Sequence, residues 1–299
     1  MELIVTPAGG SNEHIADYVR TAQEHTDAKY GFQVSLDRSV QVADLAKASG
    51  WRRSWIEGAV QRQTRGKPPF DIAYLDLEPE GGWLWKIASP NHPELFVPER
   101  DGPTLTDMLR VAAKTCADPR VRWGYYRFPH FPRRSALNDR TRDSIKRVWG
   151  PVEDHHDYIT VNQYLNRNDT RSALQRLDDA EEMVRFARQL AGDEKPVYVM
   201  VWHSWLPIAQ TTKHYVAMAL AAKRAGADGL WLWANVGNKA TRTVERAKLL
   251  DFLPHWNEIN RKTRRFVNIP KPSAIAKMTS AYANLRGGSW AQVPEGEAA

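Results

Sequence analysis

Seven short apolar segments recur along the chain, and helical patterns separate most of them. The segments are rich in β-branched and aromatic residues, and most are followed by turn residues, which is typical of strands. They span residues 2–6, 31–36, 70–78, 121–128, 158–164, 196–203 and 229–235. Because strands and helices alternate, the pattern favours βα units and a parallel sheet. We therefore predict an α/β fold, a (β/α) TIM-like barrel of seven or eight strands.

Three segments carry apolar residues at helical spacing. They are residues 104–120, 170–195 and 211–229. Thr104 is a candidate N-cap for the first helix, and Gly226 ends the third before the last apolar segment. No linker divides the core, so we expect one barrel domain over 1–265. Residues 266–299 have the character of a C-terminal extension with a loose end.

Composition narrows the class of protein. The chain has 299 residues, 42% of them hydrophobic and 26% charged, which is a globular composition. No apolar run approaches the roughly 20 residues of a membrane span, and the N-terminal stretch lacks the pattern of a secretory signal. Cys116 is the single cysteine, which excludes an intrachain disulfide and a cysteine-based zinc site. These features indicate a soluble protein without naming a compartment.

The net charge of +7 and the isoelectric point near 9.4 favour an anionic partner. Nucleic acid, an acidic polysaccharide and a membrane surface all fit this sign of charge. The net charge alone does not distinguish these three kinds of partner.

Two carboxylates close the third apolar segment, FDIAYLDLEPEGG at 70–82. Side chains alternate along a strand, so Asp76 and Glu78 point to the same side. If the strand is parallel and covered on both faces, they lie at its carboxyl end, where α/β barrels keep their sites. The alternative is a solvated acidic turn, because Pro79 and the following glycines mark a loop.

Aromatic and polar residues follow the other strands. Trp231, Trp233 and Asn235 share one face of the last strand, and Asn162 shares a face with Tyr164. Indole faces stack on sugar rings, while amides and hydroxyls bind sugar hydroxyl groups. The candidate substrate-binding residues are Trp233, Trp231, Asn162, Gln163, Asn235, His203, Trp205 and Trp83. Many of the aromatic residues fit equally well in a core, and His203 fits equally well as a hydrogen-bonding residue of the barrel rim.

The paired carboxylates match glycosidase chemistry. Positions i and i+2 of a strand lie roughly 6–7 Å apart at Cα. Mutual repulsion and partial burial raise one pKa, so that one group is an acid while its neighbour is ionised. Such adjacent carboxylates suit a substrate-assisted route, in which an N-acetyl oxygen attacks and one acid protonates the leaving oxygen.

Four motifs in order resemble the hyaluronidases of glycoside hydrolase family 56. They are DLE at the end of a strand, WGYYRFP at 123–129, QYLN at 163–166 and ALAAKRAGADGLWLW at 219–233. The family has a distorted seven-stranded barrel. The chain departs from it at Leu77 and at HFPRR, which replaces an Asp-Cys-Tyr-Asn segment, and it lacks the family's disulfides.

The resemblance implies a role for each matching residue. Glu78 would be the general acid and base, and Asp76 would position the acetamido group. Tyr126 and Tyr164 would place hydroxyls around that group, and Trp233 would form a wall of the sugar subsite. The implied substrate is a polysaccharide containing N-acetylhexosamine, and an acidic one if Arg127, Arg133 and Arg134 flank the cleft.

Other features of the sequence bear on other functions. The EDHHD cluster at 153–157 suggests a metal site, but adjacent side chains of an extended segment point apart, so we expect a solvated loop and no metal or other cofactor. Scattered basic runs allow a nucleic-acid-binding protein, although no nucleic-acid motif is present. A catalytically silent sugar-binding barrel uses the same aromatic residues and stays open. A Gly-x-Ser-x-Gly elbow is missing, which argues against a serine hydrolase.

Overall fold

The computed structural model describes residues 1–35, 53–76, 96–131, 136–163, 173–202 and 212–263. The strands are β1 Glu2–Ala8, β2 Lys29–Ser35, β3 Ile72–Asp76, β4 Arg122–Tyr125, β5 Ile159–Asn162, β6 Val197–Trp202 and β7 Gly229–Asn235. The helices are α1 Asn12–His25, α3 Arg53–Thr64, α5 Pro98–Cys116, α6 Asp139–Trp149, the 3-10 helix η3 Gly150–His155, α7 Ala173–Ala191, α8 Thr212–Arg224 and α9 Lys239–Thr263. The extension expected at 266–299 lies outside the described residues.

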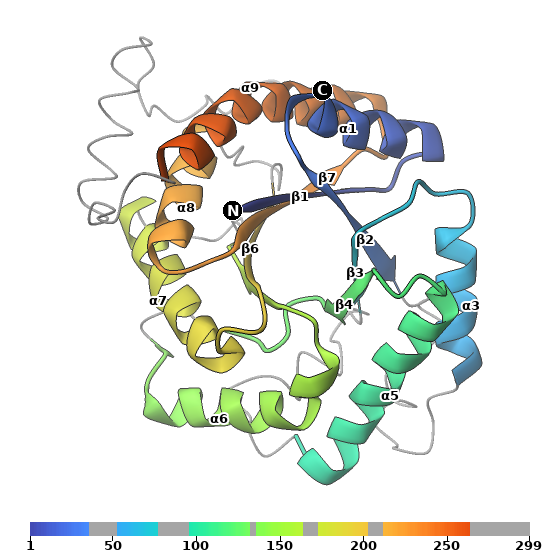
Figure 1. Ribbon diagram of the computed structural model, residues 1–299, viewed down its shortest axis with the longest axis vertical. Helices are drawn as coiled ribbons and strands as arrows, with labels where there is room; N and C mark the ends of the chain where they lie inside the picture. Colours follow the sequence, from blue (N-terminus) through green and yellow to red (C-terminus); the bar gives the residue numbers. More distant parts are fainter. Residues whose placement is uncertain (36–52, 77–95, 132–135, 164–172, 203–211, 264–299) are drawn as a thin grey trace.

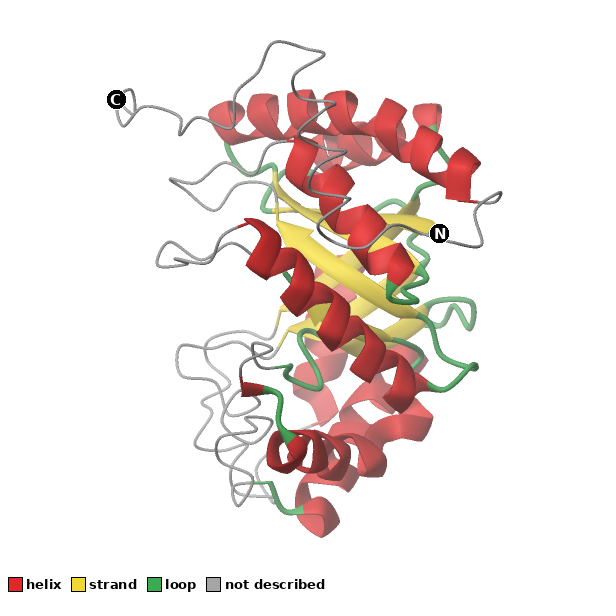
Figure 2. Cartoon of the chain, turned by 90° about the vertical axis from the view of Figure 1, so that its left-hand side faces the viewer, coloured by secondary structure: helices red, strands yellow, loops and turns green. Residues whose placement is uncertain are grey.

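The strands form one parallel sheet in the order β4-β3-β2-β1-β7-β6-β5. Helices surround it when the molecule is viewed as in Figure 1, and Figure 2 shows them covering the sheet on its outer side. All seven predicted strands are therefore confirmed, as is the (β/α) barrel class. Within the described residues, no helix combines the length and apolar character needed to span a membrane.

The barrel is nearly closed, because its two edge strands are linked. The backbone N–H of Asp157, just before β5, donates to the carbonyl of Trp123 on β4 at 3.0 Å. The Asp157 carboxylate in turn accepts from the Trp123 N–H at 2.6 Å. Tyr158 lies across this seam, and it fits because a Cβ at Gly124 would lie only 2.8 Å from its ring.

Large side chains fill the barrel interior. Tyr74, Tyr158, Tyr198 and Trp231 are at most 1% exposed and pack together there with Ile4, Ile72 and Met200. Trp231 reaches the barrel axis because β2 has Gly31 opposite it, where a Cβ would lie 2.8 Å from the indole. The alternate side chains of the strands pack outward against the helices, as the period of two requires.

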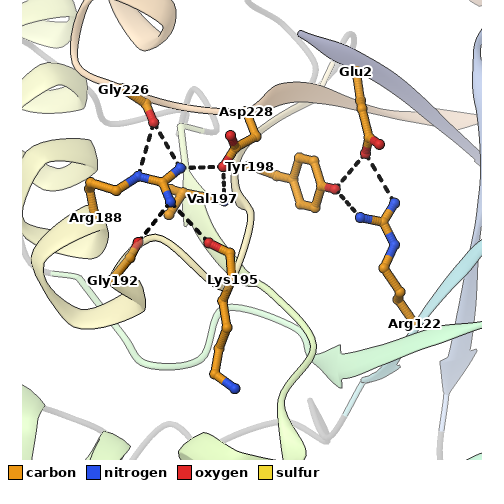
Figure 3. Close-up of polar contacts among 9 residues, drawn as sticks. All are labelled: Glu2, Arg122, Arg188, Gly192, Lys195, Val197, Tyr198, Gly226 and Asp228. Carbon is orange, nitrogen blue, oxygen red and sulfur yellow. Dashed lines mark hydrogen bonds and ion pairs between the residues drawn. The ribbon is translucent and has the colours of Figure 1, made fainter.

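A charged cluster closes the end of the barrel where the strands begin. Glu2 accepts hydrogen bonds from Tyr198 at 2.5 Å and from Arg122 at 3.0 Å (Figure 3). It also accepts one from Lys29. Burial alone would raise the pKa of Glu2, but hydrogen bonds from Lys29, Tyr198 and Arg122 outweigh it and lower the pKa to about 2. Glu2 is therefore an ionised structural group, on the opposite end of the barrel from the strand carboxyl ends.

One helix start predicted from the sequence is wrong. Helix α5 begins at Pro98, so Thr104 is internal and its hydroxyl donates to the carbonyl of Arg100 at 2.9 Å. Pro98 suits a first turn because its missing N–H needs no partner there. The Asp101 carboxylate accepts from the N–H of Val97 at 2.7 Å, which caps the helix earlier than the threonine could. The helix end at Gly226 is confirmed, since α8 stops at Arg224 and Gly226 has φ of 96°.

Candidate functional site

Asp76 ends β3 with its carboxylate bound by a residue of the neighbouring strand. In the parallel register of β2 and β3, Ser35 lies opposite Asp76. Gln33 Nε2 donates to Asp76 Oδ2 at 2.5 Å and to Ser35 Oγ at 3.0 Å. The amide therefore holds the carboxylate in place from the side of β2.

The contacts of the Gln33 amide oxygen fix the orientation of the amide group. Its Oε1 accepts from Trp233 Nε1 at 2.9 Å and from the Tyr74 hydroxyl at 3.1 Å. An indole N–H can only donate, so the atom that faces it must be the amide oxygen. Nε2 must then face Asp76. The Asp76 carboxyl oxygen is the acceptor that an N–H donor at this position requires.

Tyr74 stays a protonated phenol in this network. Burial, and then the negative charge of Asp76, raise the pKa of Tyr74 well above its usual value. Its hydroxyl is therefore a permanent donor to Gln33.

Tyr126 follows β4 and lies beside the end of β3. Its backbone N–H donates to the carbonyl of Leu75 at 3.0 Å, and its ring stacks on Tyr74 with centroids 5.6 Å apart. Arg127, the next residue, has φ of 54°, a conformation that is strained for a residue with a side chain. The Arg127 guanidinium lies 5.9 Å from the centre of the Tyr126 ring.

A cavity of about 640 Å³ opens at the carboxyl ends of β1, β2 and β7. Gln33, Trp233 and Asn235 contribute to its lining, together with the Gly9–Gly10 turn after β1. Its size falls within the range of small-molecule sites. The hydrogen-bonded group around Asp76 therefore borders an open space, and Trp233 belongs to both.

Asn162 ends β5 with a buried amide. Within the described part of the chain, neither its oxygen nor its nitrogen has a hydrogen-bond partner. Buried amides are nearly always paired in folded proteins. An unpaired amide at a strand carboxyl end is therefore consistent with a group that a ligand would satisfy.

Two of the expected substrate-binding residues lie elsewhere in the fold. Trp231 is 0% exposed in the barrel interior, where its Nε1 donates to Thr6 Oγ1 at 2.8 Å. Gln163 donates to Met183 Sδ of α7 at 3.2 Å, so its side chain faces the helix layer. Neither side chain is in a position to contact a ligand in the cavity.

Several expected site residues lie outside the described residues. They are Glu78, Tyr164, His203, Trp205, Trp83, Arg133 and Arg134. The structure thus brings together Asp76, Tyr126 and Trp233 of the expected site, and it describes neither Glu78 nor Tyr164.

The residues of the EDHHD cluster point in different directions, and the expected solvated loop is only partly right. Residues 150–155 form η3, and His155 contacts Arg110 at 3.1 Å. His156 is 1% exposed among aromatic rings and Asp157 binds the Trp123 backbone. Among the described residues, no group of three or more His, Cys, Asp or Glu side chains could hold a metal ion.

Gln33 is not among the site residues predicted from the sequence. A signal for it exists in GFQVS at 31–35, where Gly31, Gln33 and Ser35 alternate with apolar Phe32 and Val34. Polar residues on the inward face near the end of a strand form the same pattern that makes Asp76 a candidate site residue.

The fold and these residues define a (β/α) barrel with a polar and aromatic site at the strand carboxyl ends. No protein-family model matches the chain, and no curated protein matches it. Among solved structures, similarity extends to other barrels at low identity.

An endo-β-1,4-mannanase from Thermotoga petrophila is 9% identical with a TM-score of 0.41, covering 84% of this chain and 70% of the mannanase. A deoxyribose-phosphate aldolase from Toxoplasma gondii is 12% identical with a TM-score of 0.42, covering 91% and 88%. A fructose-bisphosphate aldolase from Campylobacter jejuni is 12% identical with a TM-score of 0.41, covering 96% and 84%. Similarity this low carries no argument about activity, which has to come from the site itself.

Proposed function

We propose that the protein is a glycoside hydrolase that acts on a polysaccharide containing N-acetylhexosamine. The observation that carries the proposal is the Asp76 carboxylate, held by Gln33 at the end of β3 beside a cavity with an indole in its wall. A carboxylate fixed next to an aromatic sugar platform is what a substrate-assisted glycosidase requires.

In this mechanism the acetamido oxygen of the substrate attacks the anomeric carbon. Asp76 accepts a hydrogen bond from the acetamido N–H and stabilises the positive charge that develops on the oxazolinium-like intermediate. Glu78 protonates the leaving glycosidic oxygen and then takes a proton from the water that opens the intermediate, which retains the configuration. The Tyr126 and Tyr164 hydroxyls bind the acetamido group, and the Trp233 ring packs against the sugar.

The fixed geometry of Asp76 supports its assigned role. A carboxylate that must steer a small acetamido group cannot rotate freely, and the Gln33 amide restrains it through an oriented hydrogen bond. The buried Asn162 amide, which has no hydrogen-bond partner among the described residues, supports a ligand near the end of β5, which is separated from β3 by β4 alone.

The test is a screen of polysaccharides that contain N-acetylhexosamine or uronic acid, with wild type and Glu78→Gln in parallel. Glu78→Gln keeps the shape but removes the transferable proton, so turnover should fall by a factor on the order of 10²–10⁴ with little loss of binding. Glu80→Gln, two positions further along the chain, is the matched control and should keep its activity. Equal cleavage by wild type and Glu78→Gln would refute the mechanism, and binding without cleavage by wild type would favour a silent sugar-binding barrel.

A further inference from the structure

One side of the cavity at the barrel mouth is strongly basic. Arg62, Arg65 and Lys67, from the end of α3 and the segment after it, line the cavity together with Trp233 and Asn235. No Asp or Glu occurs among the described residues that line it. The three cations therefore face a shared space with no carboxylate from these residues to balance them.

These three cations lack the ion pairs that several other arginines make in the described part of the chain. Arg53 pairs with Glu57 on the same helix, Arg20 with Asp17, and Arg120 with Asp118. No ion pair joins Arg62, Arg65 or Lys67 to a carboxylate within the described ranges. Lys67 is partly buried, and this burial lowers its pKa. Uncompensated positive charge in a partly enclosed cavity concentrates anions there.

The backbone that carries these cations is fastened to the barrel mouth. Gln63 accepts from the Ser35 N–H at 3.0 Å and donates to the Ser35 carbonyl, which ties the end of α3 to the end of β2. Asn12 at the start of α1 donates to the carbonyl of Gly66 at 2.9 Å, which holds the segment between Arg65 and Lys67. The basic side of the cavity is therefore anchored at both ends and is not a loose surface run.

The charge of the site indicates the charge of its ligand. One carboxylate would balance only one of the three cations. A phosphoryl group carries about −1.5 to −2 near neutral pH and has three acceptor oxygens, so it matches the set better. Asn12 and Asn235 add amides that suit hydroxyl groups, and Trp233 adds a flat apolar wall.

We infer that this cavity is a subsite for the phosphoryl group of a phosphorylated sugar, bound by Arg62, Arg65 and Lys67 while the sugar lies toward Trp233. The sugar part of the ligand rests on the proposed function, because Gln33 and Trp233 belong both to the cavity and to the network around Asp76. The phosphoryl part rests on the cations alone.

The experiment measures binding by calorimetry with N-acetylglucosamine 6-phosphate, inorganic phosphate, glucuronic acid and N-acetylglucosamine. The phosphorylated sugar should bind most tightly, phosphate more weakly at the same site, and the neutral sugar least. Arg62→Gln combined with Arg65→Gln should weaken binding of both phosphate-containing probes by at least about tenfold. Arg53→Gln, on the same helix but outside the cavity lining, is the matched control and should bind as wild type does.

Thermal unfolding confirms that each variant is folded. The inference would be overturned if the double variant bound the phosphate-containing probes as tightly as wild type does. It would also be overturned if glucuronic acid or the neutral sugar bound wild type as tightly as the phosphorylated sugar does. A wild type that binds no phosphate-containing probe at millimolar concentration would overturn it as well. Asp76→Asn separates the two proposals: it should keep phosphoryl binding, and loss of polysaccharide cleavage in this variant concerns only the proposed function.

Discussion

Gln33 and Asp76, on neighbouring strands, are joined by a hydrogen bond of 2.5 Å from the amide Nε2 to the carboxylate Oδ2. The bond has only one orientation, because Trp233 and Tyr74 both donate to the amide oxygen. In the proposed mechanism, Gln33 touches no reacting atom, but it sets the direction of the Asp76 carboxylate, which does.

Gln33→Met should lower turnover by about 10- to 100-fold with a smaller change in KM, because a hydrogen bond to a charged group is lost while the side-chain volume is kept. Steady-state kinetics on a substrate found in the screen measure the effect. Gln23→Met is the control, since Gln23 donates to the carbonyl of Ala28 away from the site. An equal loss of turnover in both variants would indicate general destabilisation of the protein.

Asp76→Asn should lose most of the activity on substrates with an N-acetyl group. A neutral amide stabilises the cationic intermediate less well than a carboxylate does. The Nδ2 of the new asparagine would also face a donor, Gln33 Nε2, unless the asparagine amide turns its oxygen toward Gln33. Rate constants for the wild type and the variant check this, and a variant as active as wild type would remove Asp76 from the mechanism.

His156 should make the protein less stable as the pH falls below about 6.5. Burial lowers the pKa of His156 from 6.5 to about 3, so between these values the unfolded chain binds a proton that the folded protein does not. The free energy of unfolding should therefore fall by about 2 kcal/mol between pH 7 and pH 5 on account of this residue. Denaturant unfolding at both pH values measures the difference.

His156→Phe should remove that share of the pH dependence, because an uncharged ring fits among Tyr125, Phe128 and Trp149. His130, whose pKa burial lowers to about 4, leaves a residual slope of the same sign. The prediction is wrong if His156→Phe and wild type lose the same stability between pH 7 and pH 5.

Arg188→Lys should destabilise the fold by about 2 to 3 kcal/mol. The Arg188 guanidinium donates to the carbonyls of Gly192, Lys195 and Gly226 at 2.9–3.2 Å and pairs with Asp228 (Figure 3). A lysine has three donors and no planar fork, so it leaves several of these acceptors unpaired. Arg20→Lys, in an exposed pair with Asp17, should change stability by less than about 0.5 kcal/mol. Chemical denaturation of both variants makes the comparison.

The sequence by itself determined the strands and the general place of the site. Alternation of apolar residues is local, so the run before Asp76 predicts a buried strand whatever the rest of the chain does. The order of strands and helices then predicts the barrel, and the barrel predicts that Asp76 lies at its mouth. The helix start at Thr104 failed because Pro98 and the Asp101 cap compete with it through contacts that apolar spacing does not show.

Only the tertiary structure decided which side chains meet at that mouth. Trp233 and Gln33 are 200 positions apart, and they bond because β1 pairs with both β2 and β7 in one register. A shift of one residue in either pairing would turn these side chains away from each other, since the side-chain period of a strand is two. Register is set by packing along whole strands and by closure of the barrel, and no short stretch of sequence contains that information. The same reason hid Gln33 and the basic wall of the cavity until the strands and helices that carry them were placed side by side.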